Sequence, residues 1–304
     1  MLNPEKTAGA STPQAQMAAP DQPPSAGSVA FQGEPGAYSE LAALDYFGAE
    51  TPTLPCASFE VVFEAVSAGK SAFGLVPVEN SLAGSIHRNY DLLLRNQLAI
   101  VGEYHLRVSH CLMALPGVAL EDVERVHSHP QALAQCEASL RRLDLEPVVE
   151  ADTAGSARLL LARGDRQAAA LASRRAAQVY GLHILADNME DNPANFTRFL
   201  ALATQPSQVE DPEAEGYKTS VVFALQNRPG ALFKALSVFA LRDIDLTKIE
   251  SRPVPGKPWE YLFYVDFAGH AAAPVCRRAL EHLNEITTFQ RELGSYPRHS
   301  MQPR

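Results

Sequence analysis

FGLVPVENSLAGSIHRNYDLLLRNQ, residues 73–97, is the stretch that decides the fold class. Its first part, Phe73 to Val78, is a short apolar run typical of a buried strand. Small polar residues follow this run, and Ser85 to Gln97 has the apolar spacing of a helix. A strand that passes through a polar turn into a helix is the unit from which α/β domains are built.

The same unit recurs between residues 29 and 204. This repetition predicts an α/β domain in which most strands are parallel. The further units are Val29 to Gln32 with the helix Ala37 to Phe47, Val126 to Ser128 with the helix Pro130 to Leu143, Asp152 and Thr153 opening the helix Ala154 to Arg163, and Ala169 to Leu171 with the helix Arg174 to Tyr180.

Two changes in composition divide the chain of 304 residues. Residues 1–28 are mostly Ala, Pro, Ser, Gln and Thr, which cannot offset the entropy of ordering, so we expect a disordered tail. Residues 205–217 combine prolines with a cluster of acids and are expected to be a linker. We therefore expect a larger domain over 29–204, a second domain over 218–297 and a C-terminal tail over 298–304.

Charge and hydropathy exclude several classes of partner. The chain has 26 basic and 35 acidic side chains, and its net charge of −9 repels nucleic acid. No stretch approaches the ~18 apolar residues that span a bilayer, so no membrane contact is expected. The first 28 residues contain no Arg and carry Glu5 and Asp21, unlike a transit peptide. We expect a cytoplasmic protein.

The helix starts that follow the strands offer sites for anions. The first turn of a helix leaves N–H groups unpaired and carries the positive end of the helix dipole. Ser128 and Thr153 are candidate caps, and Ser128 with Gln131 fits a capping box, although capping alone explains any one of them. Because the carboxyl ends of parallel strands share one edge, several such starts predict a cleft for a small dicarboxylate.

Other motifs indicate no further chemistry. Gly33, Gly36 and Ser39 resemble a phosphate loop, but their spacing departs from G-x-G-x-x-G and no P-loop lysine follows. His127 and His129 lack a third metal ligand nearby. The four cysteines form no C-x-x-C pair, so we expect reduced thiols and no metal. The residues alone predict an anion-binding cleft without a defined reaction.

The order of elements after the linker predicts a ferredoxin-like domain. Strands and helices follow one another as βαββαβ, which is the plan of that fold, and Pro255 with Gly256 marks the hairpin between the middle strands. The expected elements are the strand Thr219 to Leu225, the helix Pro229 to Arg242, the strands Leu246 to Arg252 and Glu260 to Phe267, the helix Ala272 to Leu283 and the strand Thr287 to Leu293.

Five motifs stand together, in order, in the larger domain. They are Gly33-x-x-Gly36-x-Tyr38-Ser39, Pro77-Val78-Glu79-Asn80-Ser81 with Gly84-Ser85, Ser128-His129-Pro130-Gln131-Ala132-Leu133, Asp152-Thr153-Ala154, and Asn195-Phe196-Thr197-Arg198-Phe199. Over roughly residues 29–293 the chain resembles the prephenate dehydratase and arogenate dehydratase family with a C-terminal ACT domain. The resemblance implies a two-lobed α/β catalytic domain like a type II periplasmic binding protein.

The resemblance also implies a reaction. Family members convert prephenate to phenylpyruvate, or arogenate to phenylalanine, by losing water and carbon dioxide together, as carbon–oxygen lyases that need no cofactor. Thr197 is the residue expected to assist departure of the ring hydroxyl. The other expected catalytic residues are Glu79, Asn80 and Ser81, and the expected substrate contacts are Ser39, Ser81, Gly84, Ser85, His129, Thr153, Ser173, Arg198 and Phe199.

Thr197 and Arg198 are neighbours in the expected strand Phe196 to Leu202, so their side chains alternate between its two faces. A threonine hydroxyl is a weak acid, and we expect Thr197 to donate a hydrogen bond to the leaving oxygen. Arg198 is expected to pair with a carboxylate or to serve the structure.

Two motifs of the second domain resemble those by which the family binds phenylalanine. They are Gly230-Ala231-Leu232-Phe233 and Glu250-Ser251-Arg252-Pro253. The resemblance implies feedback inhibition by L-phenylalanine and, because ACT domains usually pair side by side, a homodimer or homotetramer. The residues expected to bind phenylalanine are Asn227, Gly230, Ala231, Leu232, Glu250 and Ser251.

Two alternatives stay open. Residues 85–91 and 131–137 look close to the plant arogenate enzymes, whereas the missing transit peptide favours a bacterial protein that uses prephenate. We expect prephenate as the substrate, with an arogenate or dual-substrate enzyme as the alternative. A non-catalytic amino-acid sensor is the alternative from another class, and the intact motifs around Asn80 and Thr197 weigh against it.

Overall fold

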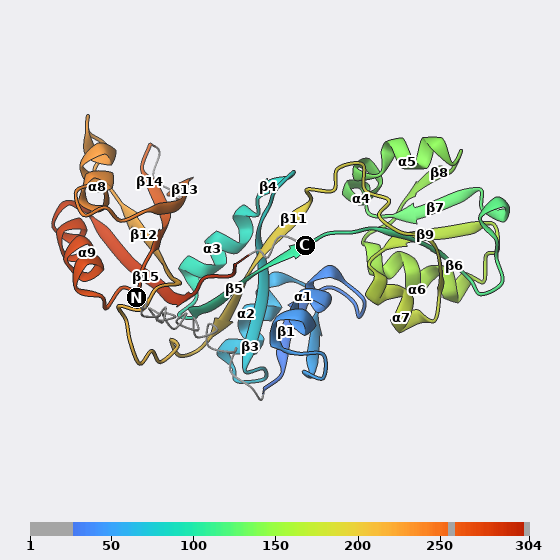
Figure 1. Cartoon of the computed structure of the whole chain (residues 1–304), viewed down its shortest axis with the longest axis horizontal. Helices are drawn as coiled ribbons and strands as arrows, with labels where there is room; N and C mark the ends of the chain where they lie inside the picture. The colour runs from blue at the N-terminus through green and yellow to red at the C-terminus, as the bar shows by residue number, and fades with distance from the viewer. Residues whose placement is uncertain (1–26, 255–258, 301–304) are drawn as a thin grey trace, which may run out of the picture.

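The structure is a computed structural model that describes residues 27–254 and 259–300. Residues 1–26 of the expected N-terminal tail, the hairpin tip Pro255-Gly256 and residues 301–304 of the expected C-terminal tail lie outside the described residues. The chain forms three bodies in a row, with the C-terminal domain at one end and two α/β lobes beside it (Figure 1).

The first lobe is built on a sheet with the strand order β2-β1-β3-β11-β5, and β4 pairs with β3. Helix α1 packs through Ala42 and Ala43 on Val29, Leu75 and Phe199 of this sheet. The elements are β1 (Val29–Gln32), α1 (Tyr38–Phe47), β2 (Thr53–Cys56), α2 (Phe59–Ser67), β3 (Phe73–Asn80), β4 (Gly84–Ser85), α3 (His87–Arg95), β5 (Ala99–Arg107) and β11 (Phe196–Ala203).

The second lobe repeats this plan with the strand order β10-β6-β9-β7-β8. Its strand β9 is buried at every residue, as expected of a central strand covered on both faces. The elements are β6 (Cys111–Ala114), η1 (Leu120–Asp122), β7 (Arg125–Ser128), α4 (Pro130–Gln135), α5 (Glu137–Arg142), β8 (Glu146–Val149), α6 (Thr153–Arg163), β9 (Ala168–Ala172), α7 (Arg174–Tyr180) and β10 (His183–Ala186).

Both sheets are mixed, and most strands of each sheet run in one direction, as expected; β11 and β4 in the first sheet and β6 in the second run opposite to the rest. Strands β1, β2 and β3 pair in parallel, as do β7, β8 and β9. Strand β11 runs antiparallel to both β3 and β5, and β6 runs antiparallel to both β9 and β10. The chain passes between the lobes from β5 to β6 and again from β10 to β11, and it is around these passages that the antiparallel strands lie.

The two passages lie side by side. The amide of Val108 donates to the carbonyl of Asn195 at 2.8 Å, and the amide of Met189 donates to the carbonyl of His110 at 2.9 Å. Two adjacent connections between two lobes form the hinge of a domain pair that can close on a ligand.

Local chemistry corrects two expected helix caps and divides one expected helix. The N-cap of α4 is His129 rather than Ser128, whose hydroxyl donates to the carbonyl of Leu171. The N-cap of α6 is Asp152, whose carboxylate accepts from Gly155, so Thr153 is the first helical residue and not the cap. The expected helix Pro130 to Leu143 breaks at Cys136 into α4 and α5.

The break has a visible cause. Both carboxylate oxygens of Asp191, from the second passage, accept from the amides of Ala138 and Ser139 at 2.9 and 3.1 Å. A carboxylate at a helix N-terminus satisfies orphan N–H groups and opposes the positive end of the dipole. A new helix therefore begins at Glu137.

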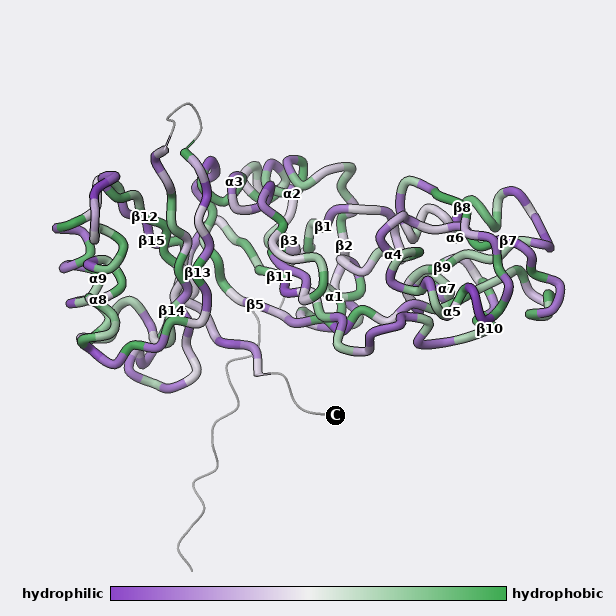
Figure 2. The backbone as a smooth tube through the Cα atoms, turned by 90° about the horizontal axis from the view of Figure 1, so that it is seen from above, coloured by the Kyte–Doolittle hydropathy of each residue, from purple (hydrophilic) through white to green (hydrophobic). Residues whose placement is uncertain are grey.

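The C-terminal domain has the expected βαββαβ order, with the sheet order β13-β14-β12-β15. Helices α8 and α9 cover the outer face of this sheet, and the other face turns toward the first lobe (Figures 1 and 2). The elements are β12 (Tyr217–Ala224), α8 (Ala231–Ala240), β13 (Leu246–Pro253), β14 (Tyr261–Ala268), α9 (Pro274–Ile286) and β15 (Phe289–Pro297).

One apolar cluster joins the C-terminal domain to the first lobe. Val222, Leu262 and Tyr264 of its sheet share a core with Tyr90 and Ile100. The inner face of the sheet is therefore buried against the first lobe. Among the described residues, no helix has both the length and the apolar character to cross a membrane.

Candidate active site

Thr197 and Asn80 meet where the first lobe adjoins the passages. Asn80 is the last residue of β3 and Thr197 is the second residue of β11, and the antiparallel register sets them directly opposite each other. Residues opposite each other across two strands point to the same face of the sheet. Both side chains are nearly buried, at 8% and 9% exposure.

The amide of Asn80 holds the Thr197 hydroxyl. Its Nδ2 donates to Thr197 Oγ1 at 3.0 Å, to Asn195 Oδ1 at 2.8 Å and to the Phe196 carbonyl at 3.2 Å. Its Oδ1 accepts from the amides of Leu82 and Ala83, which locks the side chain in a turn. Because Thr197 Oγ1 accepts from Asn80, its own hydrogen remains available to donate to a ligand.

A chain of polar contacts continues from this pair into the second lobe. Asn195 Nδ2 donates to Gln135 Oε1 at 3.0 Å, and His110 Nε2 lies 3.0 Å from the same oxygen. Since an amide oxygen only accepts, His110 carries its hydrogen on Nε2, and its Nδ1 accepts from the Tyr38 hydroxyl at 2.7 Å. Residues from α1, α4 and both passages are therefore held in one network.

His110 is held as a neutral imidazole. Burial lowers its pKa below the ordinary value, against the opposing effects of the Gln135 bond and of Glu190. Burial also raises the pKa of Tyr38 well above the ordinary value for tyrosine. The carboxylate of Glu190 joins the two passages: one oxygen accepts from the His110 amide, and Arg107 lies 3.0 Å from the other oxygen.

His110, Gln135 and Glu190 were missed from the sequence, as was the part played by Tyr38 and Asn195. The last two stand inside the quoted motifs, beside residues that were selected. His110 and Glu190 lie in the two passages, where no periodic pattern marks them.

Two of the expected serines join parts of the site to each other. Ser81 Oγ donates to the Ala194 carbonyl and accepts from the Phe196 amide, which ties β3 to the second passage. Ser173 Oγ donates to the Gly36 carbonyl at 2.5 Å and accepts from the Ala176 amide, so it joins the second lobe to the first. A Cβ at Gly36 would meet the Ala176 backbone at 2.7 Å, so this contact requires glycine.

Four other expected contacts have local roles. Ser39 is buried in the first turn of α1, and Thr153 is half-buried at the start of α6. His129 Nδ1 accepts from the Gln131 amide and caps α4. Gly84 is exposed on β4 with a positive φ of 81°, which favours glycine.

The structure directs four expected site residues away from Thr197. Phe199, an expected substrate contact, is 2% exposed and packs in the apolar core of the first lobe. Glu79 and Arg198, opposite each other one step along from Asn80 and Thr197, face the C-terminal domain. Ser85 also turns that way and donates to Glu250 at 2.6 Å. Alternation along β3 and β11 is the reason that Glu79 and Arg198 face away from their neighbours Asn80 and Thr197.

The residues expected to bind phenylalanine divide between two faces of the C-terminal domain. Gly230, Ala231 and Leu232 open α8, preceded by Asn227 in an exposed loop. Ser251 is exposed on β13.

Glu250, the residue before Ser251, instead faces the first lobe. Its carboxylate is bound by Ser85 and by His87 at 3.1 Å. Burial opposes its ionisation, but Ser85, Lys248 and His87 hold the pKa of this carboxyl below its usual range. In this structure Glu250 is therefore engaged by the first lobe.

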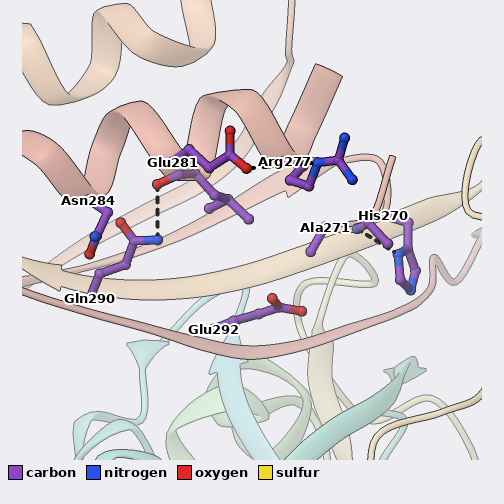
Figure 3. Close-up of a pocket in the computed structure, with 9 residues that line it drawn as sticks. His270, Ala271, Arg277, Glu281, Asn284, Gln290 and Glu292 are labelled. Atoms are coloured by element: carbon purple, nitrogen blue, oxygen red, sulfur yellow. Dashed lines mark hydrogen bonds and ion pairs between the residues drawn. The ribbon is translucent and has the colours of Figure 1, made fainter. Parts of the chain in front are cut away.

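A hollow of about 440 Å³ lies elsewhere, between α9 and β15 (Figure 3). Its charged side chains are partly paired, since Arg277 lies 3.8 Å from Glu281, and Gln290 donates to the Leu280 carbonyl. It contains none of the residues discussed above, and it is open to solvent. Over 27–254 and 259–300, no three His, Cys, Asp or Glu side chains are grouped to hold a metal ion.

Two α/β lobes joined by adjacent passages, with a hydroxyl held at the junction, define an enzyme that closes on a small molecule and carries a ferredoxin-like domain. Residues 29–207 match the family model described as prephenate dehydratase, and residues 219–281 match that of the ACT domain. The chain belongs to the prephenate dehydratase family, whose members are carbon–oxygen lyases of phenylalanine biosynthesis.

Curated relatives agree with this assignment. Arogenate dehydratase/prephenate dehydratase 2, chloroplastic, from Arabidopsis thaliana is 51% identical over 278 residues, which are 88% of this chain and 72% of the relative. Arogenate dehydratase 1 from Petunia hybrida is 50% identical over 287 residues, with coverage of 88% and 66%.

Two solved structures share the fold, and one of them is a prephenate dehydratase. Prephenate dehydratase from Arthrobacter aurescens in complex with L-Phe has a TM-score of 0.82 at 33% identity, covering 91% of this chain and 92% of that one. GqqA, described as a novel type of quorum quenching acylase, has a TM-score of 0.84 at 40% identity, covering 90% and 98%.

The expectation of a cytoplasmic protein is contradicted by these comparisons. Several Arabidopsis thaliana relatives at 48–51% identity are named as chloroplastic.

Proposed function

We propose that the chain converts prephenate to phenylpyruvate by decarboxylative dehydration, as a step of L-phenylalanine biosynthesis. The observation that carries the proposal is Thr197, whose hydroxyl is oriented by Asn80 so that its hydrogen is free to donate. Arogenate, which carries an amino group in place of the keto group, is the alternative substrate, and several relatives are named for it.

The reaction requires the transfer of one proton, to the departing hydroxyl. As the ring carboxylate leaves as carbon dioxide, the electrons of its C–C bond enter the ring and expel the ring hydroxyl, which takes up one proton and departs as water. Thr197 donates a hydrogen bond to that oxygen as charge develops on it, and Asn80 with Asn195 keeps the donor oriented. Aromatisation of the ring supplies the driving force.

The site favours this chemistry over acyl transfer. A serine nucleophile is activated by a histidine or another base within hydrogen-bonding distance. Ser81 Oγ, the serine hydroxyl beside Asn80, is bonded instead to the Ala194 carbonyl and the Phe196 amide. His110 is bonded to Gln135 and Tyr38.

We propose that L-phenylalanine regulates the enzyme through a homodimer or homotetramer. Strand β13 is at an edge of its sheet, and Ile249 on this strand is 48% exposed. Phe233 at the start of α8 is 77% exposed, beside the expected phenylalanine residues. An edge strand flanked by exposed apolar side chains is suited to pair with a second copy, and the mass in solution with and without phenylalanine tests this.

The decisive experiment supplies prephenate and arogenate separately to purified protein and follows phenylpyruvate and phenylalanine. Prephenate is expected to be consumed faster. Faster consumption of arogenate would reassign the substrate, and comparable rates would make the enzyme a dual dehydratase. If both compounds stay intact while circular dichroism shows a folded protein, the proposal fails and a sensing role replaces it.

A further inference from the structure

Four charged side chains are buried between the first lobe and the C-terminal domain. Glu103 and Arg198 come from the lobe, and Lys218 and Asp266 come from the C-terminal domain, each at most 8% exposed. Arg198 lies 2.8 Å from Glu103 and 2.6 Å from Asp266, and Lys218 lies 2.7 Å from Glu103. Each body contributes one positive and one negative charge, and docking adds the ion pairs Arg198–Asp266 and Lys218–Glu103 between the two bodies.

Arg198 is the centre of this cluster. Its Nε binds Glu103, its Nη1 binds Asp266 and its Nη2 donates to the Tyr296 hydroxyl at 3.0 Å. Ser220 donates to the second oxygen of Asp266 at 2.6 Å. A planar guanidinium bonded at three nitrogens has one orientation, which a lysine could not reproduce.

The backbone of Arg198 continues into Thr197. The register between β11 and β3 shifts directly after Arg198, which pairs with Glu79 while Phe199 pairs with Pro77. The extra residue of this bulge is Val78 on β3, because β11 pairs with β5 without a shift from Phe196 to Ala201. The bulge therefore bends β3 next to Asn80, the residue that holds Thr197. Arg198 is joined to Thr197 by a peptide bond, so the contacts that fix Arg198 also restrain the backbone of Thr197.

Stability does not explain why such a cluster is present. Replacing a buried ion network by well-packed apolar residues is often neutral or stabilising, so burial of charge is weak support for a stabilising role. Lys218 shows the cost of burying charge. Burial and the nearby Arg198 lower the pKa of its ammonium group, although Glu103 opposes this effect. The cluster holds the two domains in one relative position, and its central residue Arg198 is the neighbour of Thr197 in the chain.

We propose that Arg198 is a positioning residue for the dehydration, which acts by orienting Thr197, and that Asp266 makes this orientation depend on how the C-terminal domain is seated. The inference rests on the proposed function, in which Thr197 assists the leaving oxygen. It gives a ligand of the C-terminal domain a route to the reaction, because a shift of β14 moves Asp266 and through it Arg198.

Arg198→Lys and Asp266→Asn test the proposal, with Arg291→Lys as the matched control. Arg291 also joins the C-terminal domain to the first lobe, through the carbonyls of Leu94 and Asn96, but it touches neither β11 nor Thr197. We expect both test variants to lower kcat at least tenfold with KM within threefold. The control is expected to keep kcat within twofold, whatever it does to the unfolding midpoint.

A double variant separates positioning from a general loss of structure. If Arg198 acts through Thr197, adding Arg198→Lys to Thr197→Val changes kcat by less than threefold. A further tenfold loss in the double variant, or equal losses for Arg198→Lys and Arg291→Lys, would overturn the proposal. Should both test variants fail to fold, Ser220→Ala removes one bond to Asp266 and is expected to lower kcat about threefold.

Hydrogen exchange keeps the test independent of activity. We expect the peptide over residues 193–199 to exchange at least tenfold faster in Asp266→Asn than in Arg291→Lys. Equal exchange in the two variants would refute the link between Asp266 and Thr197. If the wild type converts neither substrate, the proposed function fails, and the exchange result still decides whether Asp266 controls the Thr197 segment.

Discussion

Replacing Thr197 by Val removes one hydroxyl while keeping the shape of the side chain. Thr197 is 9% exposed, and its Oγ1 is one of three oxygens within 3.2 Å of Asn80 Nδ2. After the change, the two hydrogens of Nδ2 still have Asn195 Oδ1 and the Phe196 carbonyl as acceptors. No donor of Asn80 is left unpaired.

The structure therefore separates the effect on stability from the effect on rate. Loss of one hydrogen bond without an orphaned partner costs about 0.5–1.5 kcal/mol of unfolding free energy. Loss of a donor to the leaving oxygen lowers the rate by about 10²–10⁴-fold, which corresponds to about 3–5 kcal/mol in the barrier. The fall in kcat is expected to exceed the fall in stability by a wide margin.

Initial rates with prephenate and thermal unfolding measure the two effects on the same samples. Thr197→Ser keeps the hydroxyl and is expected to retain most of the activity. Thr51→Val is the matched control, because it removes a hydroxyl that donates to the Phe47 carbonyl, outside the site. If Thr197→Val turns over within tenfold of the wild type while folded, Thr197 does not assist the leaving group.

Two further predictions concern stability. Burial lowers the pKa of His105 to about 4, below the ~6.5 of an unfolded chain, so the unfolded state binds the extra proton and the wild type loses stability as the pH falls from about 6.5 to 4. His105→Gln is expected to reduce this loss of stability, measured as the difference in unfolding free energy between pH 7 and pH 4.5 in urea. The same difference in the variant and the wild type would exclude His105 as the cause. Gly230 has a φ of 77° with open space around its Cβ position, so Gly230→Ala is expected to cost only the backbone strain, about 1–2 kcal/mol by thermal unfolding. A loss above about 3 kcal/mol would show that the added methyl meets a neighbour.

The sequence predicts the structure best where a pattern is local. Strand and helix periodicity placed the units of both lobes and the order of the C-terminal domain, since the spacing of apolar residues depends on the geometry of one element at a time. It also separated the faces of Thr197 and Arg198, because alternation along a strand needs no knowledge of its neighbours. It missed the long strand β5, which lies in no repeated unit, and the break at Cys136, which depends on a carboxylate 55 residues away along the chain.

The contacts of a side chain could not be predicted where the partner is distant in the sequence. Glu79, Ser85 and Glu250 stand in motifs selected for catalysis or ligand binding. Glu79 pairs with Lys248, and Ser85 binds Glu250 across 165 residues, so these motifs meet each other at the domain boundary. The sequence showed that these side chains are polar or charged, but it did not show which way they point in the fold.

The amino-acid sequence by itself determined the α/β lobes, the βαββαβ domain and the strand that carries Thr197, because short-range sterics and the burial of alternate side chains are encoded residue by residue. Only the tertiary structure decided that Asn80 holds Thr197 across 117 residues, that His110 and Gln135 complete the network, and that Arg198 faces the C-terminal domain. Contacts between distant segments depend on how sheets and domains pack, and that packing is a property of the whole folded chain.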